Sequence, residues 1–226
     1  MDNFVRPDIF NENVQAFFTD RIIGADKKKL GKVLSIKEED IFLPSQKHTD
    51  IVHTIDFDLK PKTADAVVTD RKGILIGVQV ADCVPILIFD GRRSIAGAVH
   101  AGWRGTAAQI IKKTIFAMRE CFSSRPEDLL IALGPSIRQC CYLVGKEVVD
   151  AVQEAAGDGN CYRVANDGKY LLDLSYANVL QMMSLGVSEK NIWVSDDCTS
   201  CLRDKYYSYR VSKVYNGSQG GFIGIL

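Results

Sequence analysis

The sequence predicts an α/β (α+β) fold, a single layered domain over residues 1–226 in which mixed sheets are covered by helices. Three observations predict this fold class. Short apolar runs rich in Val and Ile are typical of strands buried on both faces, and they dominate the first half of the chain. Helical patterns alternate with further strands in the second half. A chain of 226 residues suits one core, and no linker, internal repeat or low-complexity segment divides it.

The N-terminal segment predicts a strand at 14–19, followed by a short basic helix from Lys27 to Val33. Asp26 precedes this helix and is expected to cap it, because its carboxylate can accept hydrogen bonds from the first free backbone N–H groups. Pro44 follows an apolar pair and has no N–H to donate, so it indicates an edge strand or a break at that point.

Two of the three histidines, His48 and His53, lie in the next segment. If the chain is extended there, the odd offset of five places them on opposite faces, so only one can point at a shared site. His48 follows the polar residues Ser45 and Gln46, whereas His53 has apolar neighbours. We therefore expect His53 to be a partly buried, hydrogen-bonded histidine of the sheet.

Further strands are expected at 64–69, 74–81, 84–90 and 94–99. Charged and glycine-containing turns follow the first and third of these strands, at 70–73 and 91–93. The last three strands are joined by very short connections. Such connections imply that the three are antiparallel neighbours.

The second half alternates helices with strands. Thr106 is expected to cap a helix whose apolar face recurs at spacings of three and four, through Ala107, Ile111, Ile115, Met118 and Phe122. A second helix follows Gly145 and faces inward through Val148, Val152 and Ala155. A third is capped by Asp173 or Ser175 and ends before Gly186. Strands are expected at 129–133, 170–172, 192–194 and 222–226, with a polar loop at 196–201 and an aromatic segment at 206–210.

The composition excludes several classes of function. Lys and Arg number 28 against 28 Asp and Glu, so charge gives no case for nucleic acid or a membrane surface as partner. The N-terminus lacks a signal-peptide pattern, and no apolar run approaches the roughly 18 residues of a membrane span. The 7 cysteines are an odd number, which argues against a disulfide framework. We therefore expect reduced thiols and a cytoplasmic location.

Polar side chains interrupt the apolar strands at one place. Asp82 and Cys83 separate two apolar runs, and the strand that ends near Val99 is followed by His100 and a glycine-rich turn at 101–105. A carboxylate within an apolar run needs a compensating partner, so Asp82 points to a special environment. Cys83 and His100 then lie at neighbouring ends of two core strands, where functional loops are held by a rigid scaffold.

Three chemistries are compatible with these residues. His48, Cys83 and His100 would suit Zn²⁺ with a fourth position left for water or substrate, which is typical of catalytic zinc. Alternatively, Cys83 is a nucleophile with His100 as its base, or it is simply a buried structural cysteine. The C-x-x-C of Cys198 and Cys201 is expected to be incidental, because no second C-x-x-C completes four ligands. The tandem pair 140–141 is expected to be a poor partner, because adjacent side chains point apart.

A set of motifs then suggests a family. They occur in this order: Gln46-x-His48, Ala64-Asp65-Ala66-Val67-Val68-Thr69, Ala81-Asp82-Cys83-x-Pro85, His100-Ala101-Gly102-Trp103-Arg104-Gly105, Gly134-Pro135-Ser136-Ile137 with Cys141-Tyr142-x-Val144-Gly145, and Cys198-Thr199 with Ser208-Tyr209-Arg210. From about Phe17 onward the chain resembles the laccase-domain family, which is labelled multicopper polyphenol oxidoreductase and was later assigned purine nucleoside phosphorylase activity.

The resemblance implies a layered fold like the cysteine-hydrolase fold of a bacterial toxin deamidase. It implies Zn²⁺ held by His48, Cys83 and His100, phosphorolysis of adenosine, inosine, guanosine and methylthioadenosine, and deamination of adenosine. The partners expected are therefore small purine nucleosides and phosphate, with the protein a monomer or small homo-oligomer. Substrate contacts are expected from Gln46, Asp82, Arg104, Tyr142 and Arg210. In this scheme the two arginines hold phosphate, Tyr142 stacks on the base or packs in the core, and Asp82 orients a ligand or carries a proton.

Some positions depart from the family pattern. Thr49 stands where glycine is usual, Leu143 stands where glutamate is usual, a late Gly-Arg pair is not evident at 217–220, and the segment between Arg21 and Ile41 looks shorter than usual. The three metal positions are intact, and the departures fall where substrate would be held.

The copper label conflicts with the histidine count. A trinuclear copper cluster needs several imidazoles beyond a blue-copper centre, and the chain has 3 histidines in all. A single copper ion could occupy the zinc site adventitiously, because Cu²⁺ binds such ligands more tightly. A metal-free Cys–His hydrolase or amidase, a polyphenol oxidoreductase and a non-catalytic binding domain remain as alternatives.

Overall fold

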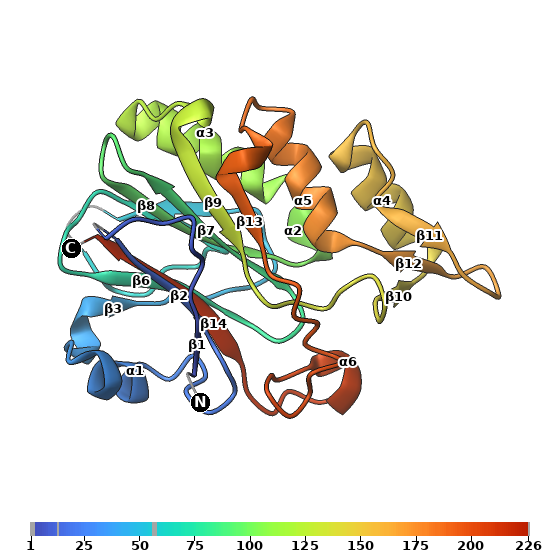
Figure 1. Ribbon diagram of the computed structural model, residues 1–226, viewed down its shortest axis with the longest axis horizontal. Helices are drawn as coiled ribbons and strands as arrows, with labels where there is room; N and C mark the ends of the chain where they lie inside the picture. Colours follow the sequence, from blue (N-terminus) through green and yellow to red (C-terminus); the bar gives the residue numbers. More distant parts are fainter. Residues whose placement is uncertain (1–2, 13, 56–57, 226) are drawn as a thin grey trace.

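The computed structural model describes residues 3–12, 14–55 and 58–225. Two sheets lie face to face and helices cover their outer faces (Figure 1). This is the mixed, layered α/β arrangement that the sequence predicts. The expected closing strand reaches Leu226, which lies outside the described residues.

The first sheet has five strands, in the spatial order β1 (Phe4–Val5), β2 (Val14–Thr19), β14 (Gln219–Ile225), β6 (Leu75–Val80) and β3 (Ile41–Phe42). All neighbours are antiparallel except β3 and β6, which are parallel. The edge position of β3 agrees with the expectation from Pro44. The strand that follows all others in chain order, β14, occupies the centre of this sheet.

The second sheet has six strands, in the order β13 (Ile192–Val194), β9 (Leu129–Leu133), β7 (Val84–Asp90), β8 (Ile95–Ala101), β5 (Ala66–Thr69) and β4 (Val52–Thr54). The two edge pairs are parallel and the inner pairs are antiparallel. A small antiparallel sheet of β10 (Leu143–Val144), β12 (Tyr170–Leu172) and β11 (Tyr162–Val164) extends from one end of the molecule (Figure 1).

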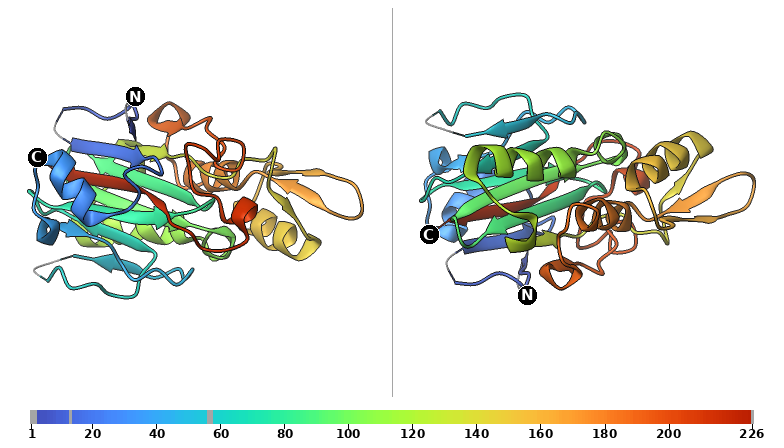
Figure 2. Two further views of the ribbon diagram at one scale, coloured as in Figure 1. Left: turned by 90° about the horizontal axis from the view of Figure 1, so that it is seen from below. Right: turned by 90° about the horizontal axis from the view of Figure 1, so that it is seen from above.

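The helices are α1 (Lys27–Leu34), α2 (Trp103–Ala107), α3 (Ile110–Phe122), α4 (Lys146–Ala156), α5 (Leu174–Met183) and α6 (Tyr209–Ser212). Three single 3₁₀ turns, at Glu38–Asp40, Pro126–Asp128 and Glu189–Asn191, each lead directly into a strand. Figure 2 shows α3 and α5 over the outer face of the six-stranded sheet. Asp26 and Asp173 cap α1 and α5 as expected, each accepting backbone N–H hydrogen bonds through its side chain.

Three apolar clusters hold the layers together. The middle cluster lies between the two large sheets and includes Phe18, Phe42, Ile76, Leu87, Phe89 and Ile223. A larger cluster joins the six-stranded sheet to its helices, and a smaller one lies under α1. The predicted helix faces are confirmed, because Ile111, Ile115, Met118, Val148 and Val152 are all buried. No helix within the described ranges has both the length and the apolarity that crossing a bilayer requires.

The expectation that β6 and β7 are neighbours is wrong, because they belong to different sheets. Residues 81–83 carry the chain from one sheet to the other. Stacked sheets lie about 10 Å apart, and three residues can span roughly that distance. A three-residue connection is therefore compatible both with a hairpin of neighbouring strands and with a change from one sheet to the other. Asp82 lies in this crossing with a φ of 87°. The pairing expected for β7 and β8 is confirmed.

The single helix expected from Thr106 is in fact two helices. α2 ends at Ala107, and Gln109 adopts a φ of 60° before α3 begins. Thr106 is therefore not an N-cap but a buried residue inside α2, where its Oγ accepts a hydrogen bond from Asn178 at 3.0 Å. Gln181 donates to the Thr106 carbonyl at 2.9 Å, so polar side chains of α5 hold the break in place.

The packing of β14 on β6 generates a stability prediction. Gly77 pairs with Phe222, and a Cβ added to Gly77 would lie 2.3 Å from Cδ1 of that ring. We expect Gly77→Ala to lower the free energy of unfolding by about 1–3 kcal/mol, because the core must be overpacked to hold it. Urea denaturation measures the change. In the double variant with Phe222→Leu the smaller side chain makes room, so its loss should be less than the sum of the single losses; additive losses would contradict the clash.

Candidate active site

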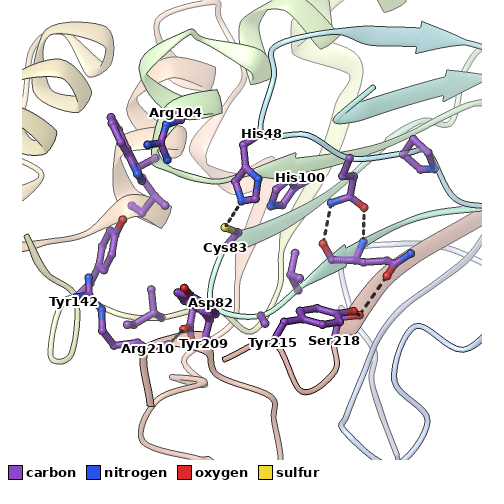
Figure 3. Close-up of a pocket in the computed structure, with 18 of the residues that line it drawn as sticks. His48, Asp82, Cys83, His100, Arg104, Tyr142, Tyr209, Arg210, Tyr215 and Ser218 are labelled. Carbon is purple, nitrogen blue, oxygen red and sulfur yellow. Dashed lines mark hydrogen bonds between the residues drawn. The ribbon is translucent and has the colours of Figure 1, made fainter. Parts of the chain in front are cut away.

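A cavity of about 800 Å³ opens where the crossing between the two sheets meets the loops after β3, β9 and β13. All eight residues singled out from the sequence as ligand or substrate positions line it: Gln46, His48, Asp82, Cys83, His100, Arg104, Tyr142 and Arg210. Figure 3 shows His48, Cys83 and His100 gathered at its centre, with Arg104 and Tyr142 to one side. The structure thus brings together residues that lie up to 164 positions apart in the chain.

The pairing of β7 with β8 explains why Cys83 meets His100. Val84 pairs with Ala101 and Pro85 pairs with His100, so Cys83 lies directly beyond the end of the ladder. Cys83 Sγ is 4.0 Å from Nε2 of His48, and the two imidazole rings are 4.8 Å apart between centroids. One donor atom from each of the three residues lies within 4.8 Å of the others.

Asp65 organises this group, and the sequence reasoning did not single it out. Its fully buried carboxylate accepts a hydrogen bond at 2.8 Å from Nδ1 of His100. The same carboxylate accepts from the backbone N–H groups of Lys47, His48 and Thr49, and from the Thr49 hydroxyl at 2.6 Å. The signal was available in the sequence, because Asp65 is a carboxylate beside the apolar residues of β5, and a carboxylate beside apolar residues is what drew attention to Asp82.

The local backbone differs from the expected extended strand at 48–53. His48 has a φ of 57°, so alternation of faces does not apply to it. His53 lies in β4, is partly buried and packs its ring 5.8 Å from that of Phe42, away from the site. Gly102 is required beside the trio, since a Cβ there would lie 3.0 Å from the sulfur of Cys83 and 3.2 Å from Cδ2 of His48.

The trio forms a coupled electrostatic unit. Burial raises the pKa of the Cys83 thiol, but the charge and hydrogen bond of His100 outweigh burial, and with His48 they lower this pKa to about 6. Burial lowers the pKa of His100, but the Cys83 thiolate and the Asp65 carboxylate together raise it above the ordinary histidine value. The pKa of Asp65 falls well below its usual range despite burial, because His100 and Thr49 bond to it. The thiolate form of Cys83 is therefore accessible near neutral pH.

The donor set fits a zinc ion. Two imidazoles and a thiolate are ligands that Zn²⁺ prefers, and three protein ligands leave one position open. Asp65 occupies Nδ1 of His100, so Nε2 is the ring nitrogen left for a metal, and a carboxylate partner of this kind fixes ligand orientation. Thr49, which departs from the family pattern, adds a hydroxyl donor to that carboxylate.

Two of the expected substrate residues have their polar atoms engaged by the protein. The side-chain amide of Gln46 donates to the Gln79 carbonyl at 2.8 Å and accepts from the Gln79 N–H at 2.7 Å. Asp82 accepts from the Thr199 hydroxyl at 2.6 Å, from the Ser208 hydroxyl at 3.1 Å and from the Arg210 N–H at 2.7 Å. Both residues therefore build the wall of the cavity through contacts with protein.

The cavity wall is rich in cations and aromatic rings. Arg104 lies 4.4 Å from the ring centroid of Trp103, and Arg210 lies 5.3 Å from that of Tyr142. Lys213 lines the cavity as well, and no ion pair in the described part of the chain involves any of these three cations. Asp82 is the single carboxylate among the described lining residues, and its oxygens are engaged.

Several lining residues were missed by the sequence reasoning: Gln79, Trp103, Tyr209, Lys213, Tyr215 and Ser218. Trp103 and Tyr209 belong to the motifs named above. Each is next to an arginine in the sequence, Arg104 and Arg210, and this could have identified both as lining residues. Gln79 lies in β6, next to the crossing. Lys213, Tyr215 and Ser218 come from the segment before β14, and no local pattern indicates that this segment returns to the crossing. Leu143, the other departure near the site, is exposed at the start of β10 and is absent from the described lining of this cavity.

The amino-acid sequence is similar to those of known proteins over most of its length. The family model described as multi-copper polyphenol oxidoreductase laccase matches residues 18–226. A Clostridium acetobutylicum protein named purine nucleoside phosphorylase is 37% identical over 186 residues, which are 82% of this chain and 77% of that protein. A protein named adenosine deaminase, from an unknown prokaryotic organism, is 36% identical over 91% of this chain and 81% of its own length.

The fold has solved counterparts. The crystal structure of YlmD from Geobacillus stearothermophilus superposes with a TM-score of 0.90 at 28% sequence identity, covering 99% of this chain and 96% of that one. A Bacillus licheniformis protein, YfiH, gives a TM-score of 0.88 at 27% identity, covering 94% of this chain and 93% of its own. The layered architecture is therefore that of experimentally determined proteins.

The contacts of Asp65 generate a prediction about metal affinity. We expect Asp65→Asn to weaken metal binding at the trio by roughly 10- to 100-fold, because the amide cannot hold His100 and the backbone of 47–49 in the same way. Competition with a chromogenic chelator measures the affinity. Asp90→Asn is the matched control, since Asp90 is equally buried but bonds to Arg93 outside the cavity. Equal weakening in both variants would show a general loss of structure instead.

Proposed function

The chain belongs to the multi-copper polyphenol oxidoreductase laccase family, and on that premise we propose that it is a zinc-dependent purine nucleoside phosphorylase that also deaminates adenosine. The observation that carries this proposal is the position of the trio beside a cationic and aromatic wall in one cavity. The names of its relatives support the same two activities.

The trio is the proposed metal site. His48, Cys83 and His100 would hold Zn²⁺, and the bound ion would supply positive charge for a phosphate and lower the pKa of a water molecule. Asp65 keeps His100 in the tautomer that presents Nε2. Gly102 leaves the space in which Cys83 and His48 approach each other.

The cations would bind and orient phosphate. Arg104 and Arg210 can each donate a pair of parallel N–H bonds to phosphate oxygens, and Lys213 adds a third positive charge. Held in this way, a phosphate oxygen is placed to attack the anomeric carbon of the ribose as the purine departs. In deamination water is the attacking group, so these cations have no equivalent partner.

The aromatic side chains would hold the base. Tyr142 lines the cavity opposite the trio in Figure 3, with Arg210 against its ring. Trp103, Tyr209 and Tyr215 line the same space. A purine offers a flat π surface, and stacking on an aromatic ring contributes about 1–3 kcal/mol for a nucleic-acid base. Stacking is tolerant of exocyclic groups, which fits the range of purines implied by the family.

Two other functions have less support. A laccase needs the trinuclear copper cluster beyond a blue-copper centre, and the 3 histidines of the chain cannot provide it. A metal-free hydrolase using Cys83 and a histidine has one specific observation in its favour, the lowered pKa of that thiol. Metal content distinguishes this hydrolase from the zinc enzyme.

We expect Cys83→Ser to lose about one zinc ion per chain and both activities, because it removes the thiolate ligand. Elemental analysis of chelator-free protein, purified without a nickel column, measures the metal. Cys121→Ser is the control, since Cys121 is also a free cysteine but is exposed and outside the cavity. Full activity in parent protein that contains no metal would instead favour the Cys–His hydrolase.

Phosphate dependence tests the reaction itself. We expect inosine cleavage to require phosphate and to yield ribose 1-phosphate and hypoxanthine, whereas adenosine deamination proceeds without phosphate. Arg104→Ala should lower kcat/KM for phosphate by roughly 10- to 100-fold, because it removes a hydrogen-bonded contact between two charged groups. The rate of deamination should change less. Product chromatography with and without phosphate measures both reactions.

The control for this experiment is Arg119→Ala. Arg119 is an exposed arginine that also lies over an aromatic ring, 4.8 Å from the centroid of Phe116, but it is outside the cavity. Cleavage of inosine to free ribose at the same rate without phosphate would make the protein a hydrolase. Deamination that survives unchanged in His48→Ala would show that the two reactions do not share the trio.

A further inference from the structure

A second group of sulfur ligands lies outside the trio. We propose that the protein binds a second metal ion, a Zn²⁺ of the structural type, in a four-cysteine cluster formed by Cys140, Cys141, Cys198 and Cys201. This proposal is independent of the catalytic assignment above, because none of these cysteines lines the described cavity.

The sulfur positions match one tetrahedral ion. All four sulfurs lie within 4.8 Å of one another. Three of their separations are 3.7 Å for Cys140–Cys141, 3.7 Å for Cys140–Cys201 and 3.3 Å for Cys141–Cys201. A tetrahedron with Zn–S bonds of about 2.3 Å has edges of roughly 3.8 Å. A divalent cation at the centre would offset the repulsion that four thiolates at these separations would have.

The expectation that adjacent cysteines point apart is wrong here, because it assumed an extended chain. Residues 139–141 form a turn, in which the N–H groups of Cys141 and Tyr142 both donate to the Arg138 carbonyl. Successive side chains in a turn are not on opposite faces, unlike those of a strand. Cys140 and Cys141 can therefore both reach the same ion.

The loop of Cys198 and Cys201 is closed by backbone hydrogen bonds. The Leu202 N–H donates to the Cys198 carbonyl at 2.9 Å, which closes a turn around the C-x-x-C. The Arg138 N–H donates to the sulfur of Cys198 at 3.4 Å, and such N–H donors favour the thiolate form. The two loops are joined where Thr199 N–H donates to the Ser136 carbonyl at 3.0 Å.

Other sulfur chemistries fit less well. A disulfide requires sulfurs about 2.05 Å apart, and the closest of the three pairs given above is 3.3 Å. An iron–sulfur cluster places several metal ions and sulfides between its cysteines, so it needs wider separations than these. A single divalent ion is the ligand that matches both the number of thiolates and their spacing.

The four-cysteine cluster would tie together two parts of the cavity wall. Tyr142, which follows Cys141, and Thr199, which follows Cys198, both lead into the active site: the first lines it, and the second donates to Asp82. Binding of the ion would therefore order the loop that carries Tyr142 relative to the crossing between the sheets. Structural zinc contributes directly to the free energy of folding in this way.

The experiment uses the full chain in a background without the first metal site. We expect Cys83→Ser protein, purified under reducing, chelator-free conditions, to retain about one zinc ion per chain with a shell of sulfur neighbours in X-ray absorption. Adding Cys201→Ser should remove this zinc and lower the melting temperature. Adding Cys121→Ser instead should leave both unchanged, since that cysteine is exposed and outside the cluster.

Three outcomes would overturn the proposal. Cys83→Ser protein that contains no metal while its remaining cysteines titrate as free thiols would show an empty cluster. A mass lower by one or two pairs of hydrogens would show disulfides in its place. A zinc with nitrogen or oxygen neighbours would show a different site. These readings use Cys83→Ser protein itself, so they stand even if Cys201→Ser fails to fold.

Discussion

The carboxylate of Asp82 is the interaction on which the active site depends. It lies in the three-residue crossing between the two large sheets, with a backbone conformation that few residues adopt easily. Its oxygens receive hydrogen bonds from Thr199, Ser208 and the backbone of Arg210, segments far away in the chain. Without these bonds a buried carboxylate would be costly, and without the carboxylate the loop of Thr199 and the segment of Ser208 and Arg210 would have no common anchor.

A second buried carboxylate completes the arrangement. Asp65 fixes His100 and the loop of His48, as Asp82 fixes the loops that carry Thr199 and Arg210. The two acids therefore hold different segments of the cavity wall. Each is fully or almost fully buried, and each has more than one strong donor. Hydrogen bonds within the chain thus fix the shape of the site, and they set the positions of the residues proposed to bind metal and substrate.

The sequence predicted what depends on local pattern. Strands such as β2, β7 and β9 were predicted at their observed bounds, because short runs rich in aliphatic and aromatic residues are local signals. The partner of β6 was not predictable, since a short connection serves a hairpin and a change of sheet equally well.

The trio was found because two of its members end core strands. Lys213 and Tyr215 were not found, because only the tertiary fold returns their segment to the cavity. The four-cysteine cluster was missed for the same kind of reason, since a turn at 139–141 was not foreseen.

The central position of β14 has a consequence for how the molecule reaches its fold. β14 separates β2 from β6, and its contacts with β2 join residues as much as 211 positions apart, as between Val14 and Ile225. During synthesis, β2 and β6 are made long before the strand that joins them. Pairing of this range slows folding, because loop-closure entropy is lost before the contacts form. Until β14 arrives, both strands present open hydrogen-bonding edges, which makes this half of the nascent protein the one in need of protection from aggregation.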